Sequence, residues 1–320
     1  MKKILFATTA LVATAGVASA EVALTGSAEM GVFGGNYADT QFFTDLDVTF
    51  TMTGEADNGL TFGATIDLDE ATDTPDFEDP SVQGGENMFI SYGGMTLTMG
   101  DTDGALDKLV PEMALAGGSL ADDETVHAGF QHGDGDALGI TGLDGLGDGQ
   151  IARLDYAYDA FTFSLSAEQV ADGADVSGMG DTVWGIAGAW SGTVSTVDLT
   201  VGLGYQAVDD YAATTGLGVV AGLAGGFSAG IDYSNTDIDG VSDDVNHWGL
   251  GLGYEMNALA VGFNWGQFDY GNDYKDSGYG LAAAYDLGGG LSAKFGFGHS
   301  DGDSFSDEVN TYSLGLAMSF

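Results

Sequence analysis

Cysteine is absent from this chain of 320 residues, and proline occurs only 3 times. The lack of cysteine excludes a disulfide scaffold, so an exported form of the chain needs another source of stability. Basic residues are also scarce, since 6 Lys and Arg stand against 49 Asp and Glu, and the formal net charge is −43. Nucleic acid and acidic lipid surfaces are therefore poor partners, because both repel a strongly acidic protein.

Long apolar runs are lacking beyond the first 20 residues. Lys2 and Lys3 precede an apolar run at residues 4–17 that ends in Ala18-Ser19-Ala20, which is the pattern of a cleavable secretory signal. We expect cleavage after Ala20, leaving residues 21–320 as a single domain. No later segment contains the roughly 18 consecutive apolar residues that a membrane-spanning helix requires. If the mature chain enters a membrane, it does so as a closed barrel of strands, since lipid cannot satisfy unpaired backbone groups.

The sequence does contain a regular alternation of apolar residues with small or polar ones, and its last nine residues display it most clearly. Tyr312, Leu314, Leu316, Met318 and Phe320 alternate with Ser, Gly and Ala residues. Successive side chains of a strand point to opposite faces, so this segment has one apolar face and one face suited to water. That combination is typical of a lipid-facing strand in a transmembrane β-barrel.

The same alternation recurs along the chain at about the length that a tilted strand needs to cross a bilayer. It predicts sixteen strands, at residues 22–34, 42–54, 60–70, 86–93, 95–102, 151–159, 161–170, 181–191, 195–208, 213–224, 227–237, 245–256, 259–270, 276–287, 291–300 and 309–320. Longer acidic loops, at 71–85, 171–180 and 301–308, exchange with tight turns at Gly93-Gly94, Asp159-Ala160, Ser191-Gly192 and Met256-Asn257-Ala258. The 54 glycines fit such turns. We therefore predict an all-β fold, a 16-stranded antiparallel transmembrane β-barrel.

Alternation also predicts which charged residues of these strands face the lumen. Four carboxylates fall on the water-facing side of two strands, namely Asp45, Asp47, Asp67 and Asp69. Arg153 and Asp155 turn inward if their neighbours face lipid, and so does Lys294. Further inward carboxylates make the wall predominantly negative, namely Glu168, Asp198, Asp232, Glu255 and Asp286. Arg153 and Lys294 could steer solutes or could instead pair with a wall carboxylate, and the sequence leaves both roles open.

One long connection, from Asp103 to Gln150, breaks the rhythm over 48 residues. Lys108 is its only basic residue, and its acidic residues are Asp103, Asp107, Glu112, Asp122, Asp123, Glu124, Asp134, Asp136, Asp144 and Asp148. A sixteen-stranded ring encloses a water-filled lumen, so a loop of this length has room to fold inward and constrict the pore. The alternative is a solvated surface loop, because sequence alone does not fix the direction in which a loop folds.

Four features together resemble the alphaproteobacterial general porins of the Rhodobacter type. They are the signal peptide followed by Glu21-Val-Ala-Leu-Thr-Gly, the Asp57-Asn58-Gly59-Leu60 turn, the Met99-Gly100-Asp101 entry to the long loop, and the terminal Phe320. The resemblance implies the outer membrane of a Gram-negative bacterium, a homotrimer, and an eyelet formed by the third external loop, here 103–150. It also implies that residues 71–85 contact a neighbouring subunit and that Phe320 serves membrane assembly.

The charge of the lumen departs from that family. General porins typically oppose an acidic eyelet loop with a wall cluster of Arg and Lys, and that cluster is almost absent here. A polar, water-filled tube needs no catalytic group and sorts solutes by width and charge. Carboxylates within about a Debye length of the axis, ~8 Å at physiological ionic strength, concentrate cations and repel anions. We therefore predict a non-enzymatic, cation-preferring channel for passive diffusion of ions and small hydrophilic solutes, surrounded by outer-membrane lipid.

Metal binding is a separate hypothesis, because calcium prefers closely spaced oxygen ligands. Such oxygens occur at Asp101 and Asp103 and again at Asp134 and Asp136, although neither pair completes a twelve-residue calcium loop. Weak calcium occupancy is compatible with these pairs, and the predicted function requires no cofactor. The four histidines form no recognisable zinc site and are interpreted as simple polar loop residues, namely His127, His132, His247 and His299.

Two other classes of function are alternatives to a channel. An enzyme is suggested only by two Gly-x-Ser-x-Gly sequences, around Ser228 and Ser300, which lack the strand-turn-helix setting of a nucleophile elbow. The abundance of glycine explains both. The alternative function is that of an acidic soluble exported β-protein, such as a calcium-dependent surface or adhesion protein. Its strands would bury their apolar faces against each other, and a terminal aromatic residue would have no special purpose.

Overall fold

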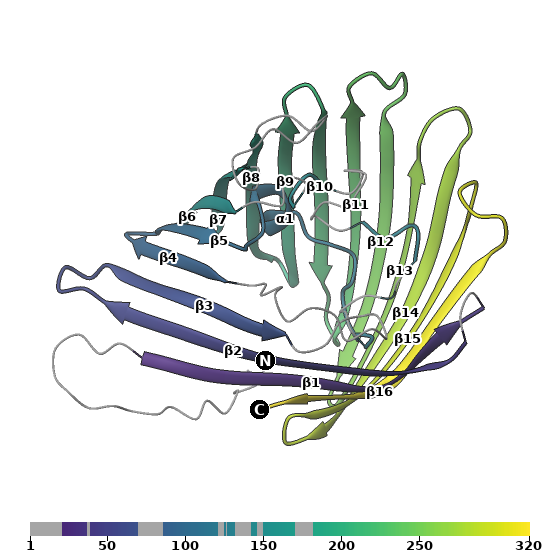
Figure 1. Cartoon of the computed structure of the whole chain (residues 1–320), viewed down its shortest axis with the longest axis horizontal. Helices are drawn as coiled ribbons and strands as arrows, with labels where there is room; N and C mark the ends of the chain where they lie inside the picture. Colours follow the sequence, from purple (N-terminus) through teal and green to yellow (C-terminus); the bar gives the residue numbers. More distant parts are fainter. Residues whose placement is uncertain are drawn as a thin grey trace.

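A computed structural model describes residues 21–36, 39–69, 86–120, 125, 127–131, 142–145, 150–169 and 182–320. These residues form a closed barrel of sixteen antiparallel strands (Figure 1). Each strand pairs with its neighbours in sequence, and the first strand pairs with the last, so the ring has no open edge. The predicted 16-stranded antiparallel barrel is confirmed.

The strand bounds lie within about three residues of those predicted from the alternation. The strands are β1 (Glu21–Gly35), β2 (Gln41–Glu55), β3 (Thr61–Asp69), β4 (Asn87–Tyr92), β5 (Met95–Gly100), β6 (Ile151–Tyr158), β7 (Phe161–Gln169), β8 (Thr182–Val194), β9 (Val197–Val208), β10 (Ala212–Gly222), β11 (Phe227–Ile238), β12 (Val245–Met256), β13 (Leu259–Asp269), β14 (Lys275–Gly288), β15 (Leu291–Gly302) and β16 (Val309–Ser319). Within the described part of the chain, one short helix, α1 (Ala105–Leu109), follows β5.

The outer face of the barrel is apolar and the inner face is small or polar, as the alternation requires. Leu203 of β9 and Leu314 of β16 point outward, and each is 55% exposed. The residues that alternate with Leu203 along β9, Gly204 and Gln206, are buried on the inner face. This arrangement is the reverse of a soluble β-protein, in which apolar side chains are buried and polar ones are exposed.

The buried apolar core lies inside the ring, between the wall and the loop that follows β5. Six buried apolar side chains belong to that loop, namely Ala105, Leu106, Met113, Leu120, Phe130 and Leu143. Leu143 packs in a cluster with Val183, Val208 and Ala212 of three neighbouring strands. The long loop therefore supplies much of the hydrophobic interior that the wall itself lacks.

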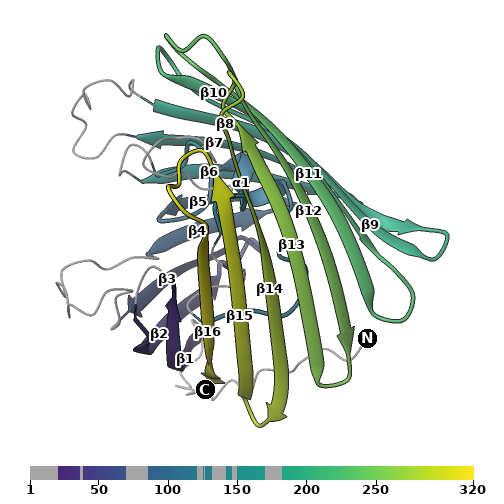
Figure 2. The same cartoon turned by 90° about the vertical axis from the view of Figure 1, so that its right-hand side faces the viewer.

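The barrel is not equally tall around its circumference. β4 and β5 have only 6 residues each, whereas β8 to β16 have 11 to 14. Figures 1 and 2 show the short strands on one side of the ring, where the long loop leaves the wall. Within the described ranges, no helix has the length and apolar character needed to span a membrane.

One predicted turn is wrong. The connection between β8 and β9 is Ser195-Thr196 rather than Ser191-Gly192, because β8 continues through Gly192 to Val194. Ser195 adopts a φ of 61°, which marks the reversal of the chain. Gly192 is a strand residue covered by an aromatic ring, since a Cβ at this position would lie 2.7 Å from Trp190 Cζ2.

Candidate functional site

The loop between β5 and β6 lies inside the barrel and follows the inner wall. Its first part, residues 105–120, which we call the outward leg, starts with α1 against β7, β8 and β9 (Figures 1 and 2). Leu106 lies against Gly204 of β9, and Met113 lies against Gly251 of β12. Leu120 reaches the seam of the barrel, where it lies beside Gly31 and Gly315. The outward leg therefore passes along the wall from β7 to β1.

The described residues after position 120 run back along the same wall, and we call residues 125, 127–131 and 142–145 the return leg. Thr125 lies at Gly280 of β14, and Gly129 lies at Gly266 of β13. Ser234 of β11 donates a hydrogen bond to Gln131 Oε1 at 2.6 Å. The loop thus forms a two-legged lining on one part of the wall.

Polar side chains of the wall accept hydrogen bonds from the loop backbone, which satisfies donors that would otherwise be buried without a partner. The donor and acceptor pairs are Ala105 N to Ser166 Oγ at 2.9 Å, Leu120 N to Ser313 Oγ at 3.3 Å, Ala128 N to Ser300 Oγ at 2.9 Å, Leu143 N to Gln206 Oε1 at 3.0 Å and Gly145 N to Glu168 Oε2 at 2.9 Å. Ser300, which lies in one of the two Gly-x-Ser-x-Gly sequences, therefore anchors the loop.

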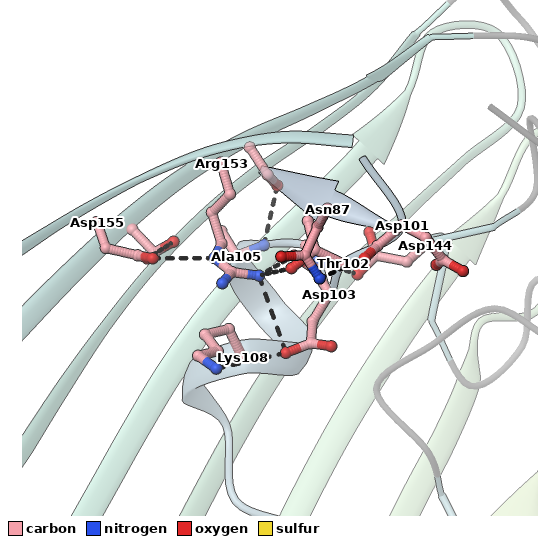
Figure 3. Close-up of polar contacts among 12 residues, drawn as sticks. Asn87, Asp101, Thr102, Asp103, Ala105, Lys108, Asp144, Arg153 and Asp155 are labelled. Atoms are coloured by element: carbon pink, nitrogen blue, oxygen red, sulfur yellow. Dashed lines mark hydrogen bonds and ion pairs between the residues drawn. The ribbon is translucent and has the colours of Figure 1, made fainter. Parts of the chain in front are cut away.

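Arg153 of β6 fixes the point where the loop leaves the wall (Figure 3). Its Nε donates to Asp155 Oδ2 at 3.1 Å, and its Nη1 donates to Thr102 Oγ1 at 3.0 Å and to the carbonyl oxygen of Asp103. The Arg153 side chain is only 5% exposed. Lys108 of α1 is 45% exposed, and its Nζ lies 3.6 Å from Asp103 Oδ2. Of these two cations, Arg153 has the position of a structural clamp and Lys108 is open to solvent.

Asp144 joins the two ends of the loop. Its carboxylate accepts a hydrogen bond from Gly104 N at 2.7 Å and another from Gln206 Nε2. Burial in the loop raises the pKa of Asp144 to about 7, and the hydrogen bond from Gly104 only partly opposes this effect. The nearby carboxylates of Asp107 and Glu168 raise the pKa further. Asp144 is thus a buried acid that titrates near neutrality.

Two histidines, His127 and His247, hold the return leg, and the interpretation as simple polar loop residues is corrected for them and for His299. His132 lies outside the described residues. His127 lies in the loop, is buried, and its Nε2 is 2.7 Å from Asn264 Oδ1 of β13. His247 lies on β12, where its Nε2 is 2.8 Å from the carbonyl oxygen of Gly129 and its Nδ1 is 3.2 Å from Asp232 Oδ1. His299 lies on β15, 2.9 Å from Asn310. Alternation places His247 and His299 in predicted strands, which is the sequence signal that distinguishes them from loop residues.

The part of the wall formed by β1, β2 and β3 carries the predicted carboxylates. Asp47 Oδ2 accepts a hydrogen bond from Ser27 at 2.8 Å, and Asp67 Oδ1 accepts one from Thr49 at 3.0 Å. Asp45 pairs in register with Glu29 of β1. These contacts put hydroxyl donors and carboxylates on the same inner face, next to the part of the wall that the loop covers.

The two inward basic residues of the wall are both paired with carboxylates. Lys294 Nζ of β15 lies 2.7 Å from Glu29 Oε1 of β1 and spans the strand between them, whose residue in register with Lys294 is Gly315. Asp155 accepts a second hydrogen bond, from Ser164 Oγ at 2.7 Å. The sequence leaves two roles open for Arg153 and Lys294. The structure contains one of them, an ion pair with a wall carboxylate.

Two expectations about the wall need correction. Glu168 and Asp232 were expected to contribute to a negative wall facing the lumen, but they are 2% and 7% exposed, because the loop covers them. Asp107 and Glu112 of the outward leg are partly buried. The remaining acidic residues of the constriction loop lie outside the described residues, namely Asp122, Asp123, Glu124, Asp134, Asp136 and Asp148, as do residues 71–85. Asp69 belongs to β3 opposite Asp47, and its side chain also lies outside the described part.

The calcium hypothesis involves residues that are only partly described. Asp103 interacts with Lys108 and Arg153, and Asp101 lies beside it at the loop entry (Figure 3). Across the described ranges, no group of three His, Cys, Asp or Glu side chains is arranged to hold a metal ion. Calcium binding therefore stays a prediction.

The feature that sequence reasoning missed is the set of wall glycines beneath the loop. They form Gly-x-Gly patterns with a large apolar residue between the glycines, as at Gly202-Leu-Gly204, Gly216-Leu-Gly218 and Gly249-Leu-Gly251. β2 and β3, which follow the part of the wall that the loop covers, carry Thr and Asp at their inner positions instead. This difference between strands was a readable signal of where the loop rests.

Comparison with known proteins gives a consistent result. A family model described as Gram-negative porin matches residues 7–304. The chain is 30% identical over 304 residues to a porin of Rhodobacter capsulatus, covering 88% of this chain and 95% of that protein. A solved variant of the Rh. blastica porin is similar at a TM-score of 0.70 and 19% identity, covering 93% of this chain and all of the other. A porin structure refined at 1.8 Å is similar at a TM-score of 0.67 and 22% identity, covering 94% of this chain and all of the other.

Proposed function

This chain belongs to the Gram-negative porin family, and from that premise we propose that its barrel is a water-filled, cation-preferring channel for ions and small hydrophilic solutes. Passive diffusion through such a tube needs no catalytic group. The family supports a channel rather than an enzyme. It also supports a location in the outer membrane.

The observation that carries the cation preference is the pairing of the basic residues. Each of the four Lys and Arg residues after position 20 lies in an ion pair with a carboxylate, namely Lys108 with Asp103, Arg153 with Asp155, Lys275 with Asp269 and Lys294 with Glu29. Positive charge in the barrel is thus neutralised locally. The inner face of β2 and β3 carries the wall carboxylates Asp45, Asp47 and Asp67, and these two strands contain no basic residue.

A local excess of carboxylates acts on ions that pass nearby. Ions within about a Debye length, ~8 Å at physiological ionic strength, feel the excess charge, so cations accumulate and anions are depleted. The effect weakens as the salt concentration rises, because screening shortens this distance. Cation preference should therefore be largest in dilute salt.

The experiment is a reversal-potential measurement on the purified protein in a planar bilayer between two potassium chloride concentrations. The test variant combines Asp45→Asn, Asp47→Asn and Asp67→Asn. We expect the wild-type protein to favour potassium and the triple variant to lose much of that preference. Weak or anionic selectivity of the wild-type protein would leave the porin assignment intact but contradict the cation preference.

The matched control removes the same amount of charge from exposed turns at the barrel rim. Asp209, Asp210 and Asp239 are exposed and lie in the β9–β10 and β11–β12 connections. A triple Asp→Asn variant at these positions should leave the reversal potential close to the wild-type value. An equal shift in both triple variants would mean that overall charge, rather than the wall of β2 and β3, decides selectivity.

A homotrimer in outer-membrane lipid is part of the same proposal. It is supported by the six-residue strands β4 and β5, which are shorter than the roughly nine to eleven residues of a lipid-spanning strand. The outer surface there carries an apolar hollow of about 530 Å³ lined by residues that include Phe62, Met88, Ile90 and Leu97. Chemical cross-linking in detergent, resolved by mass spectrometry of the intact complex, tests this assembly, and a purely monomeric species would contradict it.

Two smaller expectations complete the proposal. Removal of residues 1–20 predicts a mature protein that begins at Glu21, which mass spectrometry of the purified protein can check. Weak calcium binding at Asp101, Asp103, Asp134 and Asp136 predicts a calorimetric signal on titration with calcium. A flat titration of the folded protein would end the calcium hypothesis without affecting the channel.

A further inference from the structure

Five glycines of the inner wall touch the backbone of the loop. We call Gly202, Gly218, Gly251, Gly262 and Gly266 the seat glycines; they lie on β9, β10, β12 and β13. A Cβ added at Gly251 would lie 2.5 Å from the carbonyl oxygen of Met113, and one at Gly218 would lie 2.8 Å from that of Pro111. At the other three, a Cβ would overlap the carbonyl oxygens of Leu109, Ala116 and Gly129 even more closely. Only a residue without a side chain fits at these positions.

Backbone conformation does not explain these glycines. None of the five has a positive φ, so their backbone is open to any L-residue. Glycine inside a regular element is less stable than alanine would be, because it loses more conformational freedom on folding. Close approach of another backbone is a known reason for glycine in a strand, and it applies to all five. Other strand glycines have a different neighbour, since aromatic rings cover Gly54 and Gly192.

We infer that the seat glycines are positioning residues that set the width of the pore, because they let the loop backbone lie directly against the wall. The inference rests on the proposed channel function. The wall lies behind the loop, so any atom added between them moves the loop toward the pore axis. A Cβ added at Gly251 would lie 2.5 Å from the Met113 carbonyl oxygen. Restoring an ordinary contact of about 3.5 Å between these two atoms moves the oxygen by roughly 1 Å. The space left for solutes then shrinks.

Contact with side chains alone would be easier to relieve. At Gly230 of β11, the nearest atom to an added Cβ is Met113 Sδ, at 2.9 Å. Methionine is unbranched and flexible, so its side chain can move while the loop backbone stays in place. The backbone contacts of the seat glycines offer no such adjustment. The five positions therefore control the loop more directly than their neighbours do.

The experiment compares alanine variants on one face of one strand. Gly218→Ala is the test variant on β10, and Gly216→Ala and Gly222→Ala are matched controls on the same face. An added Cβ at Gly216 meets Leu106 Cδ1 at 3.6 Å, and one at Gly222 meets Asp198 Cβ at 3.5 Å, which are ordinary contacts. Gly251→Ala and Gly262→Ala extend the test to two more strands.

Two readouts are needed, namely unitary conductance in planar bilayers and hydrogen exchange of the loop amides at residues 113–118. We expect lower conductance, slower passage of larger sugars and faster exchange in the three test variants, with wild-type values in both controls. A role limited to barrel stability would lower the unfolding temperature without changing conductance. Unchanged conductance and exchange in folded test variants would overturn the inference, and so would equal changes in the controls.

The design distinguishes failure of the inference about the seat glycines from failure of the proposed channel function. If the wild-type barrel carries no current, the proposed function fails, while hydrogen exchange still tests whether the glycines hold the loop. If Gly251→Ala or Gly262→Ala does not fold, Gly218→Ala, whose added Cβ makes the mildest of the five overlaps, carries the test, with Gly230→Ala as a further control. Lower conductance in Gly218→Ala and wild-type conductance in Gly230→Ala support the inference, whereas equal conductance in the two variants contradicts it.

Discussion

Replacement of Arg153 by alanine gives the sharpest test of how the loop is held. The change removes a cation whose side chain is 5% exposed and which donates to Asp155, Thr102 and the Asp103 carbonyl oxygen. Breaking a fully buried ion pair costs about 3–5 kcal/mol, because the remaining charge is left without a partner. The side chains of Asp155 and Asp103 are 19% and 46% exposed, so water compensates in part. We therefore expect a loss of about 2–3 kcal/mol of unfolding free energy.

Lys108→Ala is the matched control, since Lys108 also interacts with Asp103 but is exposed. An exposed ion pair contributes only about 0–1 kcal/mol, so this variant should keep nearly full stability. Its effect should appear in the reversal potential, because loss of a solvent-accessible positive charge inside the barrel increases cation preference. Arg153→Ala should show the opposite division, with lower stability and little change in selectivity. Arg153→Lys should recover only part of the stability, because lysine keeps the charge but lacks the planar set of donors.

The assay is urea unfolding of the protein in lipid vesicles, followed by tryptophan fluorescence, together with reversal potentials of the same preparations. Equal stability of the wild-type and Arg153→Ala proteins would refute the clamp. A larger shift in reversal potential for Arg153→Ala than for Lys108→Ala would restore the steering role that the sequence left open. Stability and selectivity are measured on the same preparations, so the two roles can be separated.

Three further predictions concern Asp144, which joins the two ends of the loop, and the seam of the barrel around β1 and β16. Because the pKa of Asp144 is raised to about 7, the folded protein keeps a proton that the unfolded chain releases near pH 3.8, so this residue's contribution to stability falls as pH rises from about 4 to 7. Asp144→Asn should remove that dependence, which hydrogen exchange at the Gly104 amide across this range can check; an unchanged pH profile would contradict the assignment. The Lys294–Glu29 pair should show a coupling of about 1–2 kcal/mol in a double-mutant cycle with Lys294→Met and Glu29→Gln, whereas additive effects would mean no interaction. Deletion of Phe320, whose N–H donates to the Gly26 carbonyl oxygen at 2.8 Å, should reduce assembly in the outer membrane more than Phe320→Tyr does, and normal assembly of the truncated chain would exclude this role.

The strands could be predicted from the sequence because the alternation is a property of each segment alone. Leu203 and Tyr205 mark the outer face of β9 without any knowledge of its neighbours. The turn at Ser195 was missed because Ser191-Gly192 has the composition of a turn. The structure shows that Gly192 is instead covered by Trp190, a contact that composition does not reveal.

The position of the loop was harder to predict for a physical reason. A loop has no repeating pattern, and its resting place depends on side chains far away in sequence, such as Gln206 and Ser300. The inward direction of Glu168 and Asp232 followed from alternation, but their burial depended on what lies over them. The sign of the wall charge was therefore easier to predict than the share of that charge in contact with water.

The route of the loop also has a consequence for the order of events during biogenesis. The loop follows β5 in the sequence, yet it rests on strands that are synthesised later. Leu120 reaches the seam between β1 and β16. Contacts between residues so distant in sequence form late, because a long segment has to be ordered first. The loop cannot complete these contacts until the ring has closed. Closure of the ring and narrowing of the channel are thus successive steps, and an intermediate trapped between them would be a wider, leakier tube than the finished protein.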